Sequence, residues 1–507
     1  MRKILIGILL SLLLISSVAA QDTPVALETF TDEIYGFESV KPEGWTAAGP
    51  GIYGRAVGTQ DVTLMGQQAA PVSVQQIWPG LLPQLMLTEI PESTGQYESA
   101  ALTWDLYQVD VTAGTITVKI DLALAAGEGK TYIVLLQAAP DEYESLHEQV
   151  FLPTLEAFTP VVIETGDLPY IQEEVTFENG DITLAGTLTL PEGDGPHPAV
   201  VLITGSGGQD RDETIFSMRP FKLIADGLTP AGIAVLRYDD RGIGQSTGDF
   251  ASATTSDFAT DAAAAIEYLL TRNDINPEQI GVLGHSEGGI VSAMLGATNP
   301  HLAFIISMAG TSVNGRDVLT LQNELILRAS GASEEVIALQ LEFLTRMFAA
   351  IEAGDRDDLV EAAYETVLAQ VQTLPEEDRE ALGDLEAYAR TTAEQGAQTY
   401  FSDWFREFLN YDPAVDWAKT TVPVLALFGA KDVQVDAEQN SVPLQAALEA
   451  AGNTDVTIVT LADANHLFQA ADTGGTDEYG TLEPVFVEDF LPTIINWLST
   501  RVDLTSG

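Results

Sequence analysis

The chain has 507 residues, and its composition excludes several classes of protein. Because 46% of the residues are hydrophobic and only 19% are charged, the sequence is not that of a disordered protein, and its length indicates two or three domains. The 75 acidic residues outnumber the 22 basic ones, and a net charge of −53 would repel the phosphate backbone of a nucleic acid. The absence of cysteine excludes disulfides, thiolate metal sites and a cysteine nucleophile.

Residues 1–20 have the pattern of a signal peptide. Arg2 and Lys3 precede an apolar run over residues 4–15, and Val18 and Ala20 have the spacing that a signal peptidase prefers. The run is short for a membrane span, and no other stretch approaches ~20 apolar residues. We therefore expect a bacterial protein that is exported to the periplasm or the medium, with no stable membrane insertion after cleavage.

Residues 21–160 predict a small α+β domain. Short β-type runs at residues 115–120 and 131–136 alternate with turn residues, and a helix is expected over residues 142–158. The segment at residues 35–45, YGFESVKPEGW, resembles the start of PsbP/Mog1-like domains. The sequence reveals no cluster of titratable residues here, so we interpret the domain as an accessory or packing domain.

Beyond residue 169 the pattern changes to strands that alternate with helices, which is typical of a mainly parallel sheet with crossover helices. Strands are expected at residues 182–190, 198–203, 234–238, 280–283, 303–308 and 423–428. A helix is expected over residues 255–272, with Ser256 as a candidate N-cap. Residues 170–310 and 422–502 are therefore predicted to form the two parts of one α/β domain.

Residues 311–421 interrupt this alternation with a long helical pattern. Ile337, Leu341, Leu344, Phe348 and Ile351 recur at steps of three and four residues, which predicts an amphipathic helix. An insertion before the strand at 423–428 would lie over the carboxyl edge of the sheet, where ligands bind in open α/β folds. We interpret it as a helical cap.

The sequence GHSEG at residues 284–288 fits the G-x-S-x-G pattern of a nucleophile on a strand-to-helix turn. The context supports this interpretation, because Ser286 follows an expected strand and precedes a stretch of small residues. In hydrolases with this motif the chain order is serine, acid, base. Of the five histidines, His147, His197, His285 and His301 are poorly placed for the base, which leaves His466 after the β-type run at 456–460.

Asp432 is the predicted acid, because it follows the strand at residues 423–428 and precedes His466. Asp463 is nearer to His466 in sequence but is better explained as a turn residue. Two backbone N–H groups would stabilise an oxyanion: that of Glu287, and that of Ser206 in the glycine-containing loop at 204–212.

Several segments in chain order resemble a bacterial carboxylesterase family of α/β-hydrolases, related to serine aminopeptidases and prolyl oligopeptidases. They are GSGGQDRDE, LRYDDRGIGQSTGDF, IGVLGHSEGG, WFREFLNYDP, VLALFGAKD and NHLFQ, within residues 171–501. The resemblance implies an α/β-hydrolase fold with a helical cap and the triad Ser286, Asp432 and His466. Gly208 stands where the family pattern has proline. Residues 239–241, Asp-Asp-Arg, are expected to form a structural loop network.

These residues predict acyl transfer on a small-molecule ester of short to medium acyl chain, with no metal or organic cofactor. Trp404, Phe405 and Phe408 form an aromatic cluster that suits either an acyl chain or the anchoring of the cap. Two alternatives remain open: a peptidase that uses the same triad, and a non-catalytic exported binding protein. The oligomeric state and the physiological substrate do not follow from the sequence.

Overall fold

The computed structural model describes residues 25–504, apart from residues 33–34, 50, 56–61, 86, 88, 114–115, 162–167, 375, 377–378, 380–381 and 383. The predicted signal peptide, residues 1–20, lies outside the described residues. The chain divides into two compact units: Met1–Gly166 with Val371–Thr391, and Asp167–Gln370 with Thr392–Gly507. Within the described ranges, no helix is long and apolar enough to cross a membrane.

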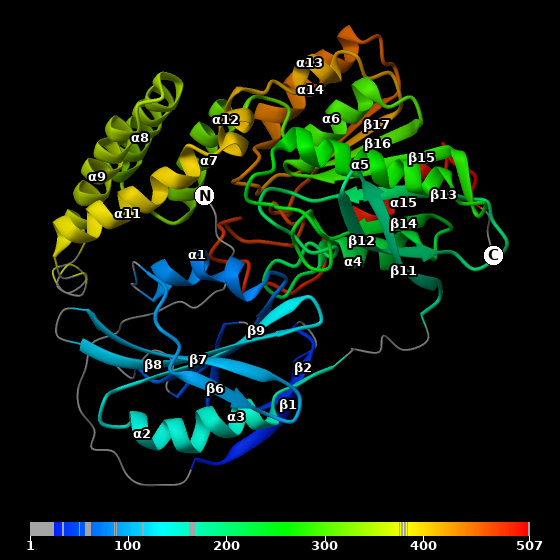
Figure 1. The fold of residues 1–507 in the computed structure, drawn as a ribbon. Helices are drawn as coiled ribbons and strands as arrows, with labels where there is room; N and C mark the ends of the chain where they lie inside the picture. Colours follow the sequence, from blue (N-terminus) through cyan, green and yellow to red (C-terminus); the bar gives the residue numbers. More distant parts are fainter. Residues whose placement is uncertain are drawn as a thin grey trace. The chain divides into compact units, whose positions relative to one another are not determined.

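The first unit contains two antiparallel sheets, a helix between two of the strands and a further helical segment after the last long strand (Figure 1). Seven strands pair in the order β3-β4-β5-β9-β8-β7-β6, and three pair in the order β1-β2-β10. The elements are β1 (Leu27–Asp32), β2 (Phe37–Pro42), β3 (Thr46–Gly49), β4 (Ile52–Gly54), β5 (Leu64–Ala70), α1 (Val74–Gln84), β6 (Gly95–Glu98), β7 (Thr103–Ala113), β8 (Ile116–Gly127), β9 (Lys130–Ala138), α2 (Tyr143–Leu146), the π-helical turn η1 (His147–Phe151), α3 (Leu152–Ala157) and β10 (Thr159–Pro160).

The core of the first unit is aromatic. Phe158, directly after α3, stacks on Phe37 of β2 at 4.3 Å and meets Trp104 of β7 edge-on at 5.2 Å. All three side chains are fully buried. The helix expected over residues 142–158 is therefore present as α2, η1 and α3, and its apolar side packs on the strands.

The second unit is a three-layer α/β structure with a helical insertion (Figure 1). From residue 171 onward the elements are β11 (Ile171–Asn179), β12 (Ile182–Leu190), β13 (His197–Ile203), α4 (Pro220–Leu228), β14 (Ala234–Tyr238), α5 (Thr255–Leu270), β15 (Ile275–His285), α6 (Gly288–Thr298), β16 (Leu302–Met308), α7 (Gly315–Ala329), α8 (Glu334–Ala353), α9 (Arg356–Gln372), α11 (Leu385–Tyr400), α12 (Asp403–Asn410), α13 (Ala414–Trp417), β17 (Val424–Gly429), α14 (Ala437–Ala450), β18 (Val456–Leu461) and α15 (Phe490–Leu498). The end of α9 and the start of α11 lie in the segment Val371–Thr391, which is grouped with the first unit.

The eight strands of this sheet have the order β11-β12-β14-β13-β15-β16-β17-β18. The first two pairings are antiparallel, and the strands from β14 to β18 are parallel. Parallel strands covered on both faces are continuous apolar runs, and β13 accordingly is buried over its whole length. Because the strands are parallel, the loops after β13, β15, β17 and β18 all emerge at the same edge of the sheet.

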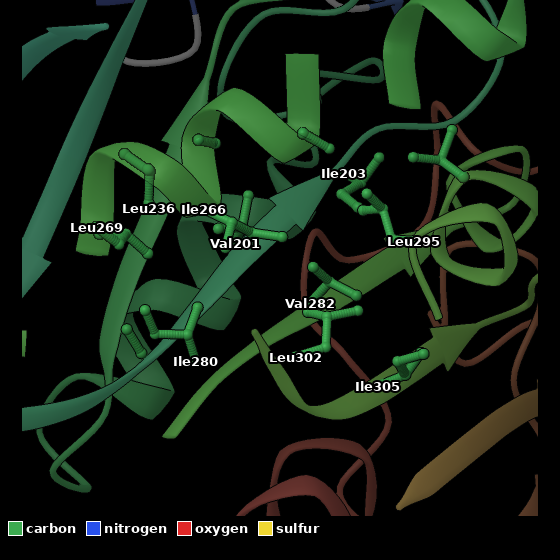
Figure 2. Packing of buried hydrophobic residues seen from close by; sticks show 14 of the residues in the cluster. Val201, Ile203, Leu236, Ile266, Leu269, Ile280, Val282, Leu295, Leu302 and Ile305 are labelled. Atoms are coloured by element: carbon green, nitrogen blue, oxygen red, sulfur yellow. The ribbon is translucent and has the colours of Figure 1, made fainter. Parts of the chain in front are cut away.

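Helices cover both faces of this sheet. Buried residues of α5, α6 and α14 belong to one apolar cluster with the strands, and those of α4 and α15 belong to another. Figure 2 shows part of the first cluster, in which strand residues such as Val201, Leu236 and Val282 lie near residues from two helices, Ile266, Leu269 and Leu295. These two clusters hold the carboxyl edge of the sheet in a fixed geometry.

Between β16 and β17 the described chain is helical, from α7 to α13. Phe343 and Met347 of α8, and Phe405 and Phe408 of α12, are buried in one cluster with Ile290 of α6. The helical insertion, which we call the cap, therefore packs on the helix that follows the G-x-S-x-G motif.

Two local details differ from the sequence-based expectations. The N-cap of α5 is Thr254, not Ser256, because Thr254 and Asp257 exchange reciprocal hydrogen bonds in a capping box. Strand β11 was not predicted, because it lies at the edge of the sheet and most of its side chains are exposed.

Candidate active site

Ser286 occupies the turn between β15 and α6 with a backbone φ of +54°. A non-glycine residue in this left-handed region is strained, and such strain is typical of a nucleophile presented on a sharp turn. The Ser286 N–H donates to the Met308 carbonyl at the end of β16, over 3.0 Å, which fixes the turn to the sheet edge.

The glycines on either side of Ser286 are required by close backbone contacts. A Cβ at Gly284 would lie 2.0 Å from the Gly288 carbonyl oxygen, and a Cβ at Gly288 would lie 2.3 Å from the Ile203 carbonyl oxygen. No side chain fits at such distances, so both positions of the motif have a steric reason.

The predicted base and acid are brought together although 34 residues separate them in sequence. His466 lies after β18 and Asp432 lies after β17, and His466 Nδ1 is 2.8 Å from Asp432 Oδ2. Both side chains are buried. Because a carboxylate faces Nδ1, the proton of the neutral imidazole resides there, which leaves Nε2 as the basic nitrogen.

The Asp432 carboxylate is itself held in place by the backbone. Its Oδ1 accepts the N–H groups of Gln434 and Val435 over 2.8 and 2.9 Å, and Oδ2 is left to His466. Asp463, the nearer acid in sequence, has a side chain that is 75% exposed and lies 3.6 Å from Lys431 Nζ. The geometry therefore pairs His466 with Asp432 and not with Asp463.

The loop after β13 approaches the nucleophile closely. A Cβ at Gly205 would lie 3.1 Å from Ser286 Cβ, a tight contact that glycine avoids without displacing the nucleophile turn. Within the described residues, the N–H groups of Ser206 and Glu287 donate to no backbone carbonyl. The Glu287 N–H also lies at the N-terminus of α6, where the helix dipole favours negative charge. Both groups remain the predicted oxyanion donors.

The Glu287 side chain connects the nucleophile turn to the cap. Its Oε1 accepts the indole N–H of Trp404 in α12 over 2.8 Å and the Thr255 hydroxyl over 2.6 Å. Burial raises the pKa of this carboxyl group, and hydrogen bonds from Thr255, Ser206 and Trp404 partly oppose the rise. Glu287 was predicted to contribute its backbone N–H to the oxyanion hole. Its side chain also has a structural role, because it connects the nucleophile turn to the cap.

The aromatic residues of α12 lie in different environments. Trp404 is half-buried and stacks on Phe408 at 5.6 Å, while its indole N–H reaches Glu287. Phe405 and Phe408 are buried in the apolar cluster of the cap. Only Trp404 is thereby connected directly to the residue after the nucleophile, and the substrate-binding role of the three residues stays a prediction.

The sequence analysis did not identify a buried pair beneath the nucleophile. His285 Nδ1 lies 2.8 Å from Glu213 Oε1, and both side chains are almost fully buried. Burial disfavours the charged imidazole, but the Glu213 carboxylate outweighs it and raises the pKa of His285. Both residues lie inside quoted segments, GSGGQDRDE and IGVLGHSEGG, but no local pattern pairs residues that are 72 positions apart.

The sequence analysis also overlooked a titratable cluster in the first unit. Asp121 is buried and accepts hydrogen bonds from the Tyr143 hydroxyl over 2.6 Å and from His147 Nδ1 over 2.7 Å. The expectation of no such cluster was wrong, because β8, α2 and η1 bring together residues far apart in sequence. Both carboxylate oxygens of Asp121 accept hydrogen bonds, so we interpret the cluster as structural.

Asp239, Asp240 and Arg241 form the structural network that the sequence predicts. Asp239 accepts hydrogen bonds from Arg211, and Asp240 accepts from the Thr204 hydroxyl and the Gln209 N–H. The Arg241 guanidinium pairs with Asp261. Across the described ranges, no group of three or more His, Cys, Asp or Glu side chains could hold a metal ion.

The strand order, the serine turn and the His466–Asp432 pair define the second unit as an α/β-hydrolase fold. The chain belongs to the X-Pro dipeptidyl-peptidase (S15) family, whose pattern it matches over residues 179–467.

Relatives support the same class. The chain is 30% identical over 304 residues to the esterase EstD of Thermotoga maritima, a match that covers 59% of this chain and 62% of EstD. It is 33% identical over 123 residues to 2,6-dihydropseudooxynicotine hydrolase of Paenarthrobacter nicotinovorans, which covers 24% of this chain and 31% of that enzyme. The matched region thus spans less than two thirds of either relative.

Solved structures of similar fold include the Pyrococcus furiosus esterase Pf2001, at 15% identity and a TM-score of 0.41, which covers 68% of this chain and 97% of that one. The proline iminopeptidase of Mycobacterium smegmatis is 19% identical with a TM-score of 0.39, and covers 65% of this chain and 98% of that one.

Proposed function

We propose that the protein is a serine carboxylesterase that acts through an acyl-enzyme on Ser286. The observation that carries the proposal is the His466–Asp432 hydrogen bond of 2.8 Å at the same sheet edge as the strained Ser286 turn. In the proposed reaction, His466 Nε2 accepts the Ser286 proton as Oγ attacks the ester carbonyl. Asp432 stabilises the resulting imidazolium, and the alcohol leaves with a proton from His466. Water activated by His466 then releases the acid.

The oxyanion of each tetrahedral intermediate would be stabilised by the N–H groups of Ser206 and Glu287. Their place beside Ser286, next to the N-terminus of α6, favours developing negative charge. An oxyanion-hole donor typically contributes about 10²–10³-fold to kcat. Esters of short to medium acyl chain are the proposed substrates, with the cap limiting longer chains.

A peptidase with the same triad is the second candidate, because the family takes its name from X-Pro dipeptidyl-peptidases. Binding of a charged substrate amine requires an available carboxylate near the nucleophile. The acids in this region are at least half engaged: Glu287 has a raised pKa and accepts from Trp404 and Thr255 on Oε1, while its buried Oε2 has no hydrogen-bond partner among the described residues, and Glu407 accepts from the Ser256 N–H and hydroxyl. This arrangement favours the ester over a peptide with a free amine.

A side-by-side assay tests the choice. The wild-type enzyme is expected to hydrolyse p-nitrophenyl acetate and butyrate with a higher kcat/KM than aminoacyl- or X-Pro p-nitroanilides. Ser286→Ala and His466→Ala should each reduce kcat on the ester by several orders of magnitude. His301→Ala is the matched control, since His301 is exposed and should leave kcat unchanged. A higher kcat/KM on any anilide would replace the esterase proposal by the peptidase one.

Residues 1–20 support export as a further part of the proposal. Expression of the full chain in a Gram-negative host should place a mature protein in the periplasm, with its N-terminus at or near Gln21. A full-length protein retained in the cytoplasm would contradict export.

A further inference from the structure

Glu213 and His285 together contact three segments that carry proposed catalytic groups. Glu213 Oε1 accepts the N–H of Gly205, the residue before the proposed oxyanion donor Ser206, over 2.7 Å. The same oxygen lies 2.8 Å from Nδ1 of His285, the residue before the nucleophile. His285 Nε2 lies 3.1 Å from the carbonyl oxygen of His466, the proposed base.

The partners of His285 determine its protonation. A carbonyl oxygen only accepts hydrogen bonds, so the contact with His466 requires a proton on Nε2. Glu213 Oε1 already accepts from Gly205, and a proton on Nδ1 of His285 would give the same carboxylate oxygen a second donor. An imidazolium at His285, with Glu213 as the carboxylate that balances it, satisfies both contacts and agrees with the direction in which the pKa of His285 is shifted.

We propose that Glu213 and His285 form a buried ion pair that positions the oxyanion loop, the nucleophile turn and the base loop relative to one another. Both residues act through their neighbours and are positioning residues. This inference rests on the proposed serine hydrolase function, because it assigns the pair a role in that reaction.

Two observations distinguish this role from simple packing. Burial of an ion pair is costly and adds little net stability compared with apolar residues of the same volume, whereas its hydrogen bonds are directional. In addition, Glu213 has a φ of +52°, a strained backbone conformation like that of Ser286 itself. Glu213 is strained and holds the Gly205 N–H of the loop beside the nucleophile. The strain is explained if the position of this loop relative to Ser286 has to be fixed.

Loss of the pair should therefore affect turnover more than binding. A displacement of about 1 Å among catalytic groups can cost on the order of 10²-fold in rate. Glu213→Gln removes the charge and keeps the side-chain shape, and His285→Gln keeps an N–H that can reach the His466 carbonyl. We expect each variant to reduce kcat for p-nitrophenyl butyrate by about 10- to 1000-fold, with KM changed less than about threefold.

The double variant tests whether the residues act as a unit. If they do, Glu213→Gln with His285→Gln should lose little more kcat than either single variant. His147→Gln is the control, because His147 and Asp121 form a similar pair of 2.7 Å in the first unit. It should leave kcat unchanged. Additive losses in the double variant, kcat within threefold of wild type, or an equal kcat loss in His147→Gln would overturn the proposal.

A spectroscopic measurement is independent of activity. With ¹⁵N-labelled histidine, the five side chains can be resolved by NMR, and His285→Gln assigns the signal that disappears. Both nitrogens of His285 should have imidazolium shifts at pH 7.5, and Glu213→Gln should shift them toward the neutral form. A neutral His285 in the wild type would overturn the ion pair. If the wild type hydrolyses no ester, the proposed function fails, whereas this test of the pair still stands.

Discussion

The choice of Asp432 over Asp463 as the acid that pairs with His466 depends on their distances from His466 in space. Asp463 is only three positions from His466, yet the loop between them turns its carboxylate into solvent, toward Lys431. Asp432 is 34 positions away but follows the neighbouring parallel strand, and two backbone N–H groups hold its other oxygen. The adjacency of strands β17 and β18 therefore determines which acid pairs with His466, whereas proximity in sequence does not.

This difference predicts unequal effects of two isosteric substitutions. Asp432→Asn should reduce kcat on p-nitrophenyl butyrate by about 10³- to 10⁴-fold, because an amide can hold the imidazole in the wrong tautomer and cannot stabilise the imidazolium. Asp463→Asn should leave kcat within about twofold, since the residue is exposed and its ion pair with Lys431 contributes little. Steady-state kinetics with matched circular dichroism spectra measures both. A larger loss of kcat in Asp463→Asn than in Asp432→Asn would show that Asp463, and not Asp432, is the acid that pairs with His466.

At the scale of the element, helix α12 connects the cap to the nucleophile turn. Trp404 donates to Glu287, and Glu407 accepts from Ser256 at the start of α5. Ser402 caps the helix at its N-terminus, and Phe405 and Phe408 bury its apolar side. Two polar contacts and one buried side therefore fix α12 over the residue that supplies a proposed oxyanion donor.

The Trp404 hydrogen bond should accordingly influence catalysis. Trp404→Phe removes a donor from the buried Glu287 carboxyl group at a cost of about 1 kcal/mol, which predicts a several-fold lower kcat/KM on p-nitrophenyl butyrate. Trp497→Phe in α15 is the matched control, because its indole N–H also donates to a side chain, the Thr457 hydroxyl, over 3.2 Å. The kcat/KM of each variant is compared with that of the wild type after thermal unfolding has shown that the two variants are equally stable. A loss of kcat/KM in Trp497→Phe as large as that in Trp404→Phe would contradict the specific role of Trp404.

Elements could be predicted where burial produces a clear pattern. The expected strands at 182–190 and 234–238 agree with β12, in which threonine alternates with apolar residues, and with β14, which is apolar except for Arg237 and Tyr238; both are buried over most of their length. Strand β11 was missed because an exposed edge strand has no such pattern. The cap of α5 was misplaced by two residues, since Thr254, Thr255 and Ser256 are all acceptable N-cap residues and only the contact with Asp257 selects one.

At the scale of the whole molecule, the proposed triad and both oxyanion donors lie in the second unit, Asp167–Gln370 with Thr392–Gly507. The segment Val371–Thr391 of the cap region is grouped with the first unit instead. A polypeptide that begins at residue 168 retains all of the proposed catalytic residues and the whole sheet of the second unit.

This truncated protein should therefore hydrolyse p-nitrophenyl acetate with a kcat close to that of the mature protein. Its thermal stability can fall, because the segment at 371–391 loses the unit with which it is grouped. Circular dichroism and analytical gel filtration establish that the protein is folded before the assay. A folded, soluble and inactive product would show that the first unit shapes the active site and would contradict its accessory role.

The sequence by itself determined the fold class, the strands of the buried sheet and the residues of the proposed triad. It could do so because apolar periodicity and the G-x-S-x-G motif are local patterns, and because chain order restricts which acid and histidine can follow the serine. Tertiary structure alone decided the pairing of His466 with Asp432 in space, the contact between Trp404 and Glu287, and the buried Glu213–His285 pair. Each of these joins loops from different strands, and their distances depend on sheet order and helix packing, which no local pattern encodes.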